Sequence, residues 1–372
     1  MGQTTIQWTN DVWNPLLGCS RVSLGCGGPQ GQGGCYAEKM AWRLAAMGVR
    51  GYAGLTKKVG DDIRWTGEVH LVESVLDLPL LWKRPRRIFV NSMSDLFHEK
   101  VPDEWIDRIF SVMALAAQHT FQVLTKRPER MLAYLSKAAV RHHVCGGDGC
   151  PYCADTGRIA WALAPYSNVW LGVSVEDQAT ADERIPLLLQ TPAALRWVSY
   201  EPALADIDFA FGRWLRLLRT VRSDIPGTNL WATSGVYRAE SNKNGALSVR
   251  STGGTLLGVK PDEFERLPAV DWLVCGGESG SGARPFDLAW ARSAITQCRA
   301  AGVPVFCKQL GAFPVYSEDG LGEPFGPGID ADEPITVLPG GRMYHRLKLK
   351  DRKGADWNEW GFEDLRVREW PL

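Results

Sequence analysis

Residues 87–125 read RIFVNSMSDLFHEKVPDEWIDRIFSVMALAAQHTFQVLT, with two apolar stretches on either side of a helical pattern. The apolar stretches, Arg87–Asn91 and Thr120–Thr125, are nearly continuous rather than alternating, which is typical of parallel strands buried on both faces. The segment between them, Asp103–Ala117, follows Pro102 and brings four apolar side chains to one helical face: Ile106, Ile109, Phe110 and Met113. These residues predict a strand, a helix and a second strand joined by a right-handed crossover.

The same alternation continues on both sides of this unit. Further parallel strands are predicted at Val12–Gly18, Val169–Ser174, Leu195–Ser199, Asp271–Gly276 and Val303–Lys308. A second clear helix is predicted over Asp287–Ala301, with Leu288, Ala291, Ile295 and Cys298 inward and Gly302 as its stop. Six or seven strands predict an α/β fold with a partial or full TIM-type (β/α) barrel, and a doubly wound open sheet is the alternative.

Composition limits the class of protein. The chain has 372 residues, of which 45% are hydrophobic and 23% charged, values that exclude wholesale disorder. Lys and Arg number 42 and so do Asp and Glu, which excludes a strongly basic nucleic-acid coat protein but not a local basic groove. No apolar run is long enough to cross a membrane, so we expect a soluble, cytoplasmic protein without a membrane partner.

We expect one elaborated domain. The barrel is predicted over residues 1–311, with insertions at 141–158 and 208–267 and a C-terminal extension, 312–372, that packs on the barrel. The second insertion is expected to begin with an amphipathic basic helix, Phe211–Val221, and to continue as a turn-rich β-like segment.

Polar residues follow the predicted strands. The turns are Gly18-Cys19, Asn91-Ser92-Met93-Ser94-Asp95, Thr125-Lys126-Arg127, Ser174-Val175-Glu176-Asp177, Ser199-Tyr200-Glu201-Pro202 and Gly276-Gly277-Glu278-Ser279. Each turn alone could be a helix cap, but active sites of barrels form at the carboxyl ends of their strands. Six such turns in succession predict a polar site at that end.

Cys19, Cys26 and Cys35 form a C-x6-C-x8-C pattern in the glycine-rich segment GCSRVSLGCGGPQGQGGCYAEKM, residues 18–40. Three thiolates are one short of a structural zinc site, so zinc would need a distant histidine. An iron–sulfur cluster held by three thiolates would leave one iron free to bind a small molecule. Reduced thiols without a metal are the third interpretation.

Several blocks of the sequence carry a resemblance to a known family. They are WTNDVWNPLLGC, CYAE, FVNSMSDLFHE, FQVLTKRPERM, GVSVEDQ, VSYEPAL and WLVCGGESGSGARPFDLAWARSAITQCRAAGVPVFCKQLG. Together they resemble a phage and bacterial family of three-cysteine-motif proteins of unknown function, which is similar to the radical S-adenosylmethionine enzymes. The resemblance covers most of residues 4–205 and 268–311.

The resemblance implies a partial barrel with a 4Fe–4S cluster bound by Cys19, Cys26 and Cys35, and S-adenosylmethionine on the unique iron. The superfamily places an aromatic residue just before its third cysteine and has shorter gaps, whereas here Tyr36 follows Cys35. S-adenosylmethionine would need partners for its ammonium, carboxylate and ribose groups. Our candidates for binding this cofactor are Asn91, Ser92, Ser94, Lys126 (or Arg127), Glu176, Glu201, Gly276, Gly277 and Glu278.

A second metal site is predicted in the first insertion. The twelve residues 142–153, HHVCGGDGCPYC, contain two histidines and three cysteines: His142, His143, Cys145, Cys150 and Cys153. The interpretation is a zinc ion bound by His143, Cys145, Cys150 and Cys153, with an auxiliary iron–sulfur cluster or a metal-free loop as alternatives. The other three cysteines, Cys275, Cys298 and Cys307, have apolar neighbours and are expected in the core.

Basic residues accompany aromatic ones in three segments, Arg84–Arg87, Phe211–Arg222 and Arg342–Lys353. Such segments suit a nucleic acid, for which DNA is favoured over RNA, although a solvated helix face is the simpler interpretation. The hypothesis is a radical S-adenosylmethionine enzyme that modifies or repairs a nucleic acid base and receives electrons from an external donor. The alternatives are a non-catalytic zinc protein that binds nucleic acid and a radical enzyme for a small metabolite or peptide.

Overall fold

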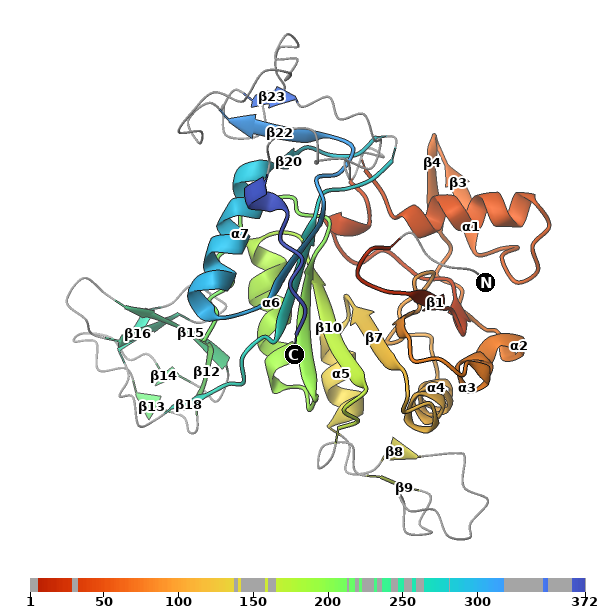
Figure 1. The fold of residues 1–372 in the computed structure, drawn as a ribbon, viewed down its shortest axis with the longest axis horizontal. Coiled ribbons are helices and arrows are strands. Elements are labelled where there is room, and N and C mark those ends of the chain that lie inside the picture. Colours follow the sequence, from red (N-terminus) through yellow and green to blue (C-terminus); the bar gives the residue numbers. More distant parts are fainter. Residues whose placement is uncertain are drawn as a thin grey trace.

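The computed structural model describes residues 6–28, 33–136, 165–212, 214, 267–280, 282–316 and 364–371 in full, and the backbone of short strands between them. Its centre is a sheet of seven parallel strands that curls into a half-barrel (Figure 1). The strands are β1 (Asp11–Trp13), β6 (Arg87–Val90), β7 (Thr120–Thr125), β10 (Val169–Val175), β11 (Leu195–Tyr200), β19 (Trp272–Gly276) and β21 (Val305–Gln309).

The order of strands in the sheet follows their order in the chain, β1-β6-β7-β10-β11-β19-β21. A doubly wound sheet would reverse direction at a switch point, and this sheet does not. The predicted α/β fold of six to seven parallel strands in a partial barrel is therefore confirmed.

Five main helices accompany the sheet, with α4 to α7 against its outer face (Figure 1). They are α1 (Tyr36–Ala46), α4 (Asp103–Leu115), α5 (Pro128–Leu135), α6 (Gln178–Gln190) and α7 (Leu288–Ala301), beside the short α2 (Glu73–Leu76) and α3 (Leu78–Leu81). The predicted inward faces of α4 and α7 are buried, and Gly302 ends α7 in the left-handed conformation with φ 67°. Asp177 caps α6 by accepting a hydrogen bond from the backbone of Thr180.

The predicted first strand, Val12–Gly18, is wrong in its bounds. The chain instead forms β1 and a separate β2 (Leu16–Leu17), which pairs antiparallel with β5 (His70–Leu71). Pro15 lies between them, and proline has no N–H to donate to a sheet. The chain therefore leaves the main sheet at this point.

The predicted helix Phe211–Val221 is also wrong. Trp214–Leu217 is the strand β12, which pairs antiparallel with β15 (Val236–Ser241) on one side and β18 (Phe264–Arg266) on the other. Two further strands, β16 (Leu247–Arg250) and β17 (Leu256–Gly258), complete this five-stranded sheet. Pairing on both sides satisfies the backbone of β12, which overrides the amphipathic helical pattern of the segment.

Smaller groups of strands flank the half-barrel. They are β3 (Thr56–Val59) with β4 (Asp62–Trp65), β8 (Val140–Arg141) with β9 (Arg158–Ile159), β13 (Val221–Arg222) with β14 (Trp231–Ala232), and β20 (Phe286–Asp287), β22 (Pro314–Ser317) and β23 (Tyr344–Arg346) together. Short 3-10 turns occur at Leu24–Cys26 and Glu363–Leu365. Near the C-terminus, Val367 accepts a hydrogen bond from Cys307 and Glu369 donates one to Val305, so this part of the extension runs along the edge of β21.

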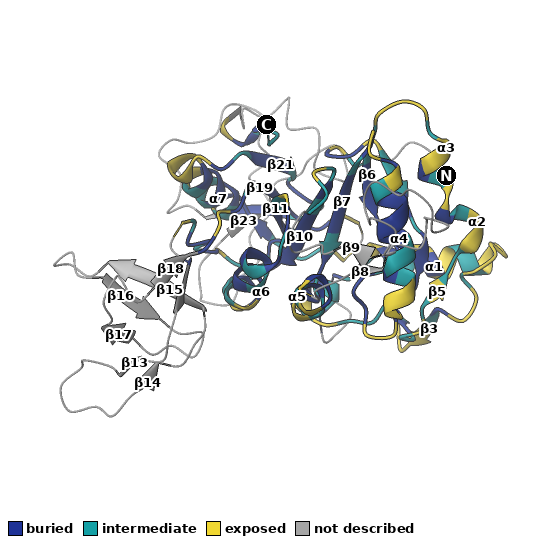
Figure 2. Ribbon diagram, turned by 90° about the horizontal axis from the view of Figure 1, so that it is seen from below, coloured by how far each residue is buried: buried dark blue, intermediate teal, exposed yellow. Residues whose placement is uncertain are grey.

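Two apolar layers cover the two faces of the sheet. The larger lies between the sheet and the outer helices, and buried residues concentrate there in Figure 2. The smaller is an aromatic cluster within the curl, built from Trp8, Phe89, Trp197, Trp272, Val274 and Phe306. An added Cβ at Gly172 would lie 2.5 Å from the Trp197 ring, so only glycine leaves room for it. This inner cluster explains part of the tryptophan content of the chain.

Among the described residues, no helix has the length and apolar character needed to cross a membrane.

Trp272 lies at the centre of the inner cluster, because five other aromatic rings within it or beside it lie 5.1–6.3 Å away: Trp8, Trp170, Trp197, Phe306 and Trp370. We expect Trp272→Ala to lower the free energy of unfolding by about 3–5 kcal/mol, measured by urea denaturation. Trp42→Ala, at a tryptophan that is 40% exposed, should change it by less than about 0.5 kcal/mol. Equal losses in the two variants would show that the inner cluster is not a packed core.

Candidate functional site

A cavity of about 250 Å³ lies at the carboxyl ends of the parallel strands. Its wall comes from the last residues of β7, β10, β11 and β21 and from the loops that follow β2, β6, β7, β11 and β19, together with the inner aromatic residues Trp8 and Phe89. Of the predicted site residues, it is lined by Cys19, Cys26, Cys35, Asn91, Ser92, Ser94, Lys126, Glu201, Gly277 and Glu278. Residues distant in sequence thus meet where the barrel architecture places a site.

The three cysteines reach this cavity through one loop that links β2 to α1. Cys26 ends a 3-10 turn, and its carbonyl accepts a hydrogen bond of 3.2 Å from the amide of Cys35. Cys35 then precedes the first turn of α1 as its N-cap residue. The loop therefore brings three sulfurs to the wall of one cavity.

The thiols of Cys19 and Cys35 are neutral at pH 7. Burial raises the pKa of Cys35 to about 11, and burial together with Asp95 raises the pKa of Cys19. Thiols with raised pKa values are poor nucleophiles, whereas a bound metal or cluster favours the thiolate. Neither thiol is therefore poised to act as a catalytic nucleophile.

Among the described residues, no three His, Cys, Asp or Glu side chains stand close enough to hold a single metal ion. A 4Fe–4S cluster takes its thiolates on separate iron atoms, so three thiols on the wall of one cavity are a donor set that such a cluster would accept.

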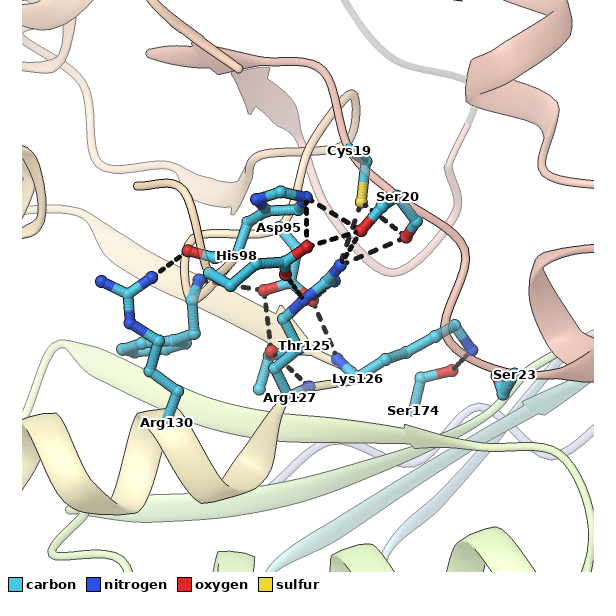
Figure 3. Close-up of polar contacts among 12 residues, drawn as sticks. Cys19, Ser20, Ser23, Asp95, His98, Thr125, Lys126, Arg127, Arg130 and Ser174 are labelled. Carbon is cyan, nitrogen blue, oxygen red and sulfur yellow. Dashed lines mark hydrogen bonds and ion pairs between the residues drawn. The ribbon is translucent and has the colours of Figure 1, made fainter. Parts of the chain in front are cut away.

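Arg127 joins the cysteine loop to the strand ends (Figure 3). Its guanidinium donates to Asp95 at 3.2 Å, to Glu99 at 2.9 Å, and to the Ser20 hydroxyl at 2.7 Å and carbonyl at 3.2 Å. It also lies 3.8 Å from the sulfur of Cys19. Asp95 and Glu99 hold the guanidinium charged, and their negative charges raise the pKa of Arg127 against the opposing effect of burial. We predicted Arg127 as an alternative to Lys126 for binding the carboxylate of S-adenosylmethionine. In the structure its donors instead bind the cysteine loop and the neighbouring carboxylates.

His98 supports the same loop. Its Nδ1 accepts from the backbone N–H of Lys100 at 3.1 Å, so the proton lies on Nε2, 3.0 Å from the Ser20 hydroxyl. Burial lowers the pKa of His98, which favours this neutral form.

Glu176 is buried beneath the loop and does not line the cavity. Its carboxylate pairs with Lys126 and, at 3.2 Å, with Arg184, and it accepts a hydrogen bond of 3.0 Å from Ser23. An added Cβ at Gly25 would lie 2.4 Å from this carboxylate, so glycine allows the loop to rest on it. Both Glu176 and Lys126, predicted cofactor ligands, are thus occupied by partners within the protein.

Glu278 holds the other end of the loop. It accepts a hydrogen bond of 2.9 Å from the Gly34 amide and pairs with Arg284 at 3.1 Å. Arg284 in turn donates to the carbonyl of Leu24 at 2.6 Å. Glu278 lines the cavity, as predicted. Its carboxylate oxygens, however, already bind Gly34 of the loop and Arg284.

The residues after β6 differ in their freedom to bind a ligand. Ser92 donates to Asn14 at 3.2 Å and Ser94 to the Leu16 carbonyl at 3.0 Å. Asn91 adopts a positive φ of 62°, and its Oδ1 accepts from the Leu16 amide at 3.3 Å. Its buried Nδ2 has no hydrogen-bond partner among the described residues, and neither does the indole N–H of Trp8. These two donors on the cavity wall can bind a ligand that presents acceptors.

Glu201 and Lys308 form an ion pair of 3.1 Å, and both line the cavity. Gly276 lies behind this pair, since an added Cβ would be 2.8 Å from Glu201, and an added Cβ at Gly277 would clash with the Leu310 carbonyl at 2.5 Å. The two glycines therefore allow backbone packing, and only Gly277 lines the cavity.

Sequence reasoning missed three residues of the site as individual candidates: Trp8, Asp95 and Lys308. Asp95 accepts hydrogen bonds from Thr125, Lys126 and Arg127, which joins the ends of β6 and β7. Asp95 could have been found from its place in the turn after the predicted strand Arg87–Asn91, and Lys308 from its place at the end of the predicted strand Val303–Lys308. Nothing in the local sequence marks Trp8.

Other predictions fall elsewhere. The candidate zinc ligands His143, Cys145, Cys150 and Cys153 lie outside the described residues, as does most of the basic segment 342–353. Cys275, Cys298 and Cys307 are buried in the core, as predicted.

We expect Arg127→Met to lower the free energy of unfolding by about 3–5 kcal/mol in urea denaturation, because Asp95 would be left buried without its cation. Arg108→Met removes a more exposed ion pair with Glu73 and should cost at most about 1 kcal/mol. If Arg127→Met is no more destabilising than Arg108→Met, Arg127 does not anchor the loop.

Comparisons with known proteins give one match. A family model described as "Protein of unknown function (DUF5131)" matches residues 3–360. No curated protein and no solved structure matches the chain. Because the model covers nearly the whole sequence, including the cysteine loop and all seven sheet strands, the chain belongs to the DUF5131 family.

Proposed function

We propose that this protein is a radical S-adenosylmethionine enzyme that binds a 4Fe–4S cluster and modifies or repairs a nucleic acid base. One observation carries the proposal: Cys19, Cys26 and Cys35 line a single cavity at the carboxyl ends of a parallel half-barrel. A cluster bound there, with S-adenosylmethionine, would supply a carbon radical able to attack an unactivated C–H bond.

The protein's own residues hold the cysteine loop in place. Arg127, Glu176 and Glu278 bind different parts of it, through Ser20, Ser23 and Gly34 respectively. The Arg127 guanidinium next to Cys19 would also offset negative charge on the thiolates. Three buried or nearly buried side chains from three strand ends therefore preorganise the ligands.

Glu201 and Lys308 suit the methionyl end of S-adenosylmethionine. An α-amino acid carries an ammonium beside a carboxylate, and the Glu201–Lys308 pair offers the complementary charges on the cavity wall. Asn91 and Trp8, which also line the cavity, have one buried donor each without a partner among the described residues, and a group that bears acceptors could bind there.

We propose a nucleic acid base as the substrate because the sequence contains segments in which basic and aromatic residues occur together. An external donor would supply the electron that starts the reaction. A zinc ion bound by His143, Cys145, Cys150 and Cys153 would fold the first insertion.

The test is anaerobic reconstitution with iron and sulfide, followed by reductant and S-adenosylmethionine. We expect a brown protein with four irons per cluster that releases 5′-deoxyadenosine. Cys26→Ala should lose the colour and the product, because one of the three ligands is removed. Cys298→Ala, at a buried cysteine of α7 away from the cavity, should keep both. A colourless protein that contains only zinc would overturn the proposal.

Lys308→Met tests the proposed binding of the methionyl carboxylate. Loss of a charged hydrogen bond should raise the S-adenosylmethionine concentration at half-maximal rate by about tenfold or more. Lys100→Met removes a surface pair with Glu68 and should leave this concentration unchanged. An unchanged value in Lys308→Met would assign the carboxylate to another residue.

A further inference from the structure

Helix α1 and the hairpin β3–β4 form one surface beside the mouth of the cavity. They contact each other and lie side by side in Figure 1. Tyr36, the first residue of α1, and Trp65, the last of β4, both line the cavity, and Glu38 accepts a hydrogen bond from the Trp65 amide at 3.0 Å. We call this surface, residues 36–65, the α1 face.

The α1 face and the cysteine loop before it expose unusually many apolar side chains. Of the eleven large hydrophobic residues that are exposed in the described chain, eight lie between residues 22 and 59. They are Val22, Leu24, Tyr36, Met40, Trp42, Met47, Val49 and Val59. Scattered apolar residues are ordinary, but a concentration of them in one part of a surface indicates an interaction site.

The same surface is cationic. Residues 36–65 contain six cations and three acids, and two of the acids, Glu38 and Asp62, form ion pairs with Arg21 and Arg64. Arg43, Arg50, Lys57 and Lys58 are exposed, and none has an ion-pair partner among the described residues. Asp61 is the other acid of the segment, so positive charge remains in excess.

The cavity itself offers no free cation for a phosphate among the residues that the structure describes. Lys126 is paired with Glu176 and Arg127 with Asp95, and Lys308 with Glu201 is the pair that we assign to the methionyl end of the cofactor. A polyanion that presents one group to the cavity must therefore be bound outside it. The α1 face, which adjoins the mouth, supplies unpaired cations together with exposed aromatic rings.

We propose that the α1 face binds single-stranded nucleic acid, with Arg43, Arg50, Lys57 and Lys58 on phosphates and Trp42 stacked on a base. Phosphate contacts by lysine and arginine and stacking on aromatic rings together bind single strands. This site rests on the proposed function and deepens it by placing the substrate, and its binding to nucleic acid does not require a cluster.

The test is fluorescence anisotropy with a labelled DNA single strand, and an RNA strand of the same sequence, over a series of salt concentrations. Two double variants, Arg43→Gln/Arg50→Gln and Lys57→Gln/Lys58→Gln, should each weaken binding at least tenfold. Each should also lower the slope of log K against log salt by about 0.7 for every phosphate that the variant no longer neutralises. Trp42→Ala should weaken binding by about tenfold without changing this slope.

The matched control is Lys83→Gln/Arg299→Gln, which neutralises two exposed cations, one before β6 and one in the last turn of α7, at the end of the sheet away from the cavity. It should bind like the unmodified chain, and circular dichroism should show that all variants fold. Unchanged binding in the α1 variants, or an equal loss of binding in the control, would overturn the inference. If the α1 face instead binds an acidic protein, the α1 variants should bind nucleic acid as the unmodified chain does. A chain that binds the strand through the α1 face but releases no 5′-deoxyadenosine would refute the proposed reaction and not this site.

Discussion

The guanidinium of Arg127 is the contact on which the geometry of the site depends. It joins the end of β7 to Asp95 after β6 and to Ser20 in the cysteine loop, three segments that are far apart in the sequence. A planar group with five donors can hold several acceptors at fixed angles, which an ammonium cannot. Since the partners of Arg127 are anionic, hydroxyl or carbonyl oxygens, the buried charge is compensated, and the loop is fixed where its first cysteine meets the cavity.

The aromatic cluster within the curl has a different role. It fills the half-barrel below the cavity, with Trp272 against Trp197 and Trp370, and so covers the inner face of the sheet. Polar groups then begin at the level of Asn91 and Ser199, where the strands end. The result is a small cavity with an apolar base and a polar rim, the arrangement that ligand sites commonly have.

Strand positions followed from local pattern, because a strand covered on both faces leaves a nearly continuous apolar run. Six of the seven sheet strands therefore agree with prediction to within one or two residues, among them Thr120–Thr125. The grouping of Cys19, Cys26 and Cys35 could also be predicted, since they share one loop after the first strand. By contrast, Phe211–Val221 has a helical pattern, but Trp214–Leu217 within it forms a strand whose pairing partners lie 20 to 50 residues away.

The sequence by itself determined the α/β class and the succession of parallel strands, because these depend on the periodicity of apolar residues. It also determined that Cys19, Cys26 and Cys35 lie together at the carboxyl ends of the strands, because all three belong to one loop. Only the tertiary structure decided which polar residues are free. Glu176, Glu278 and Lys126 stand at strand ends as predicted, yet Glu176 and Lys126 pair with each other and Glu278 pairs with Arg284. The partner of a buried charge is fixed by packing between distant segments, and no local pattern records it.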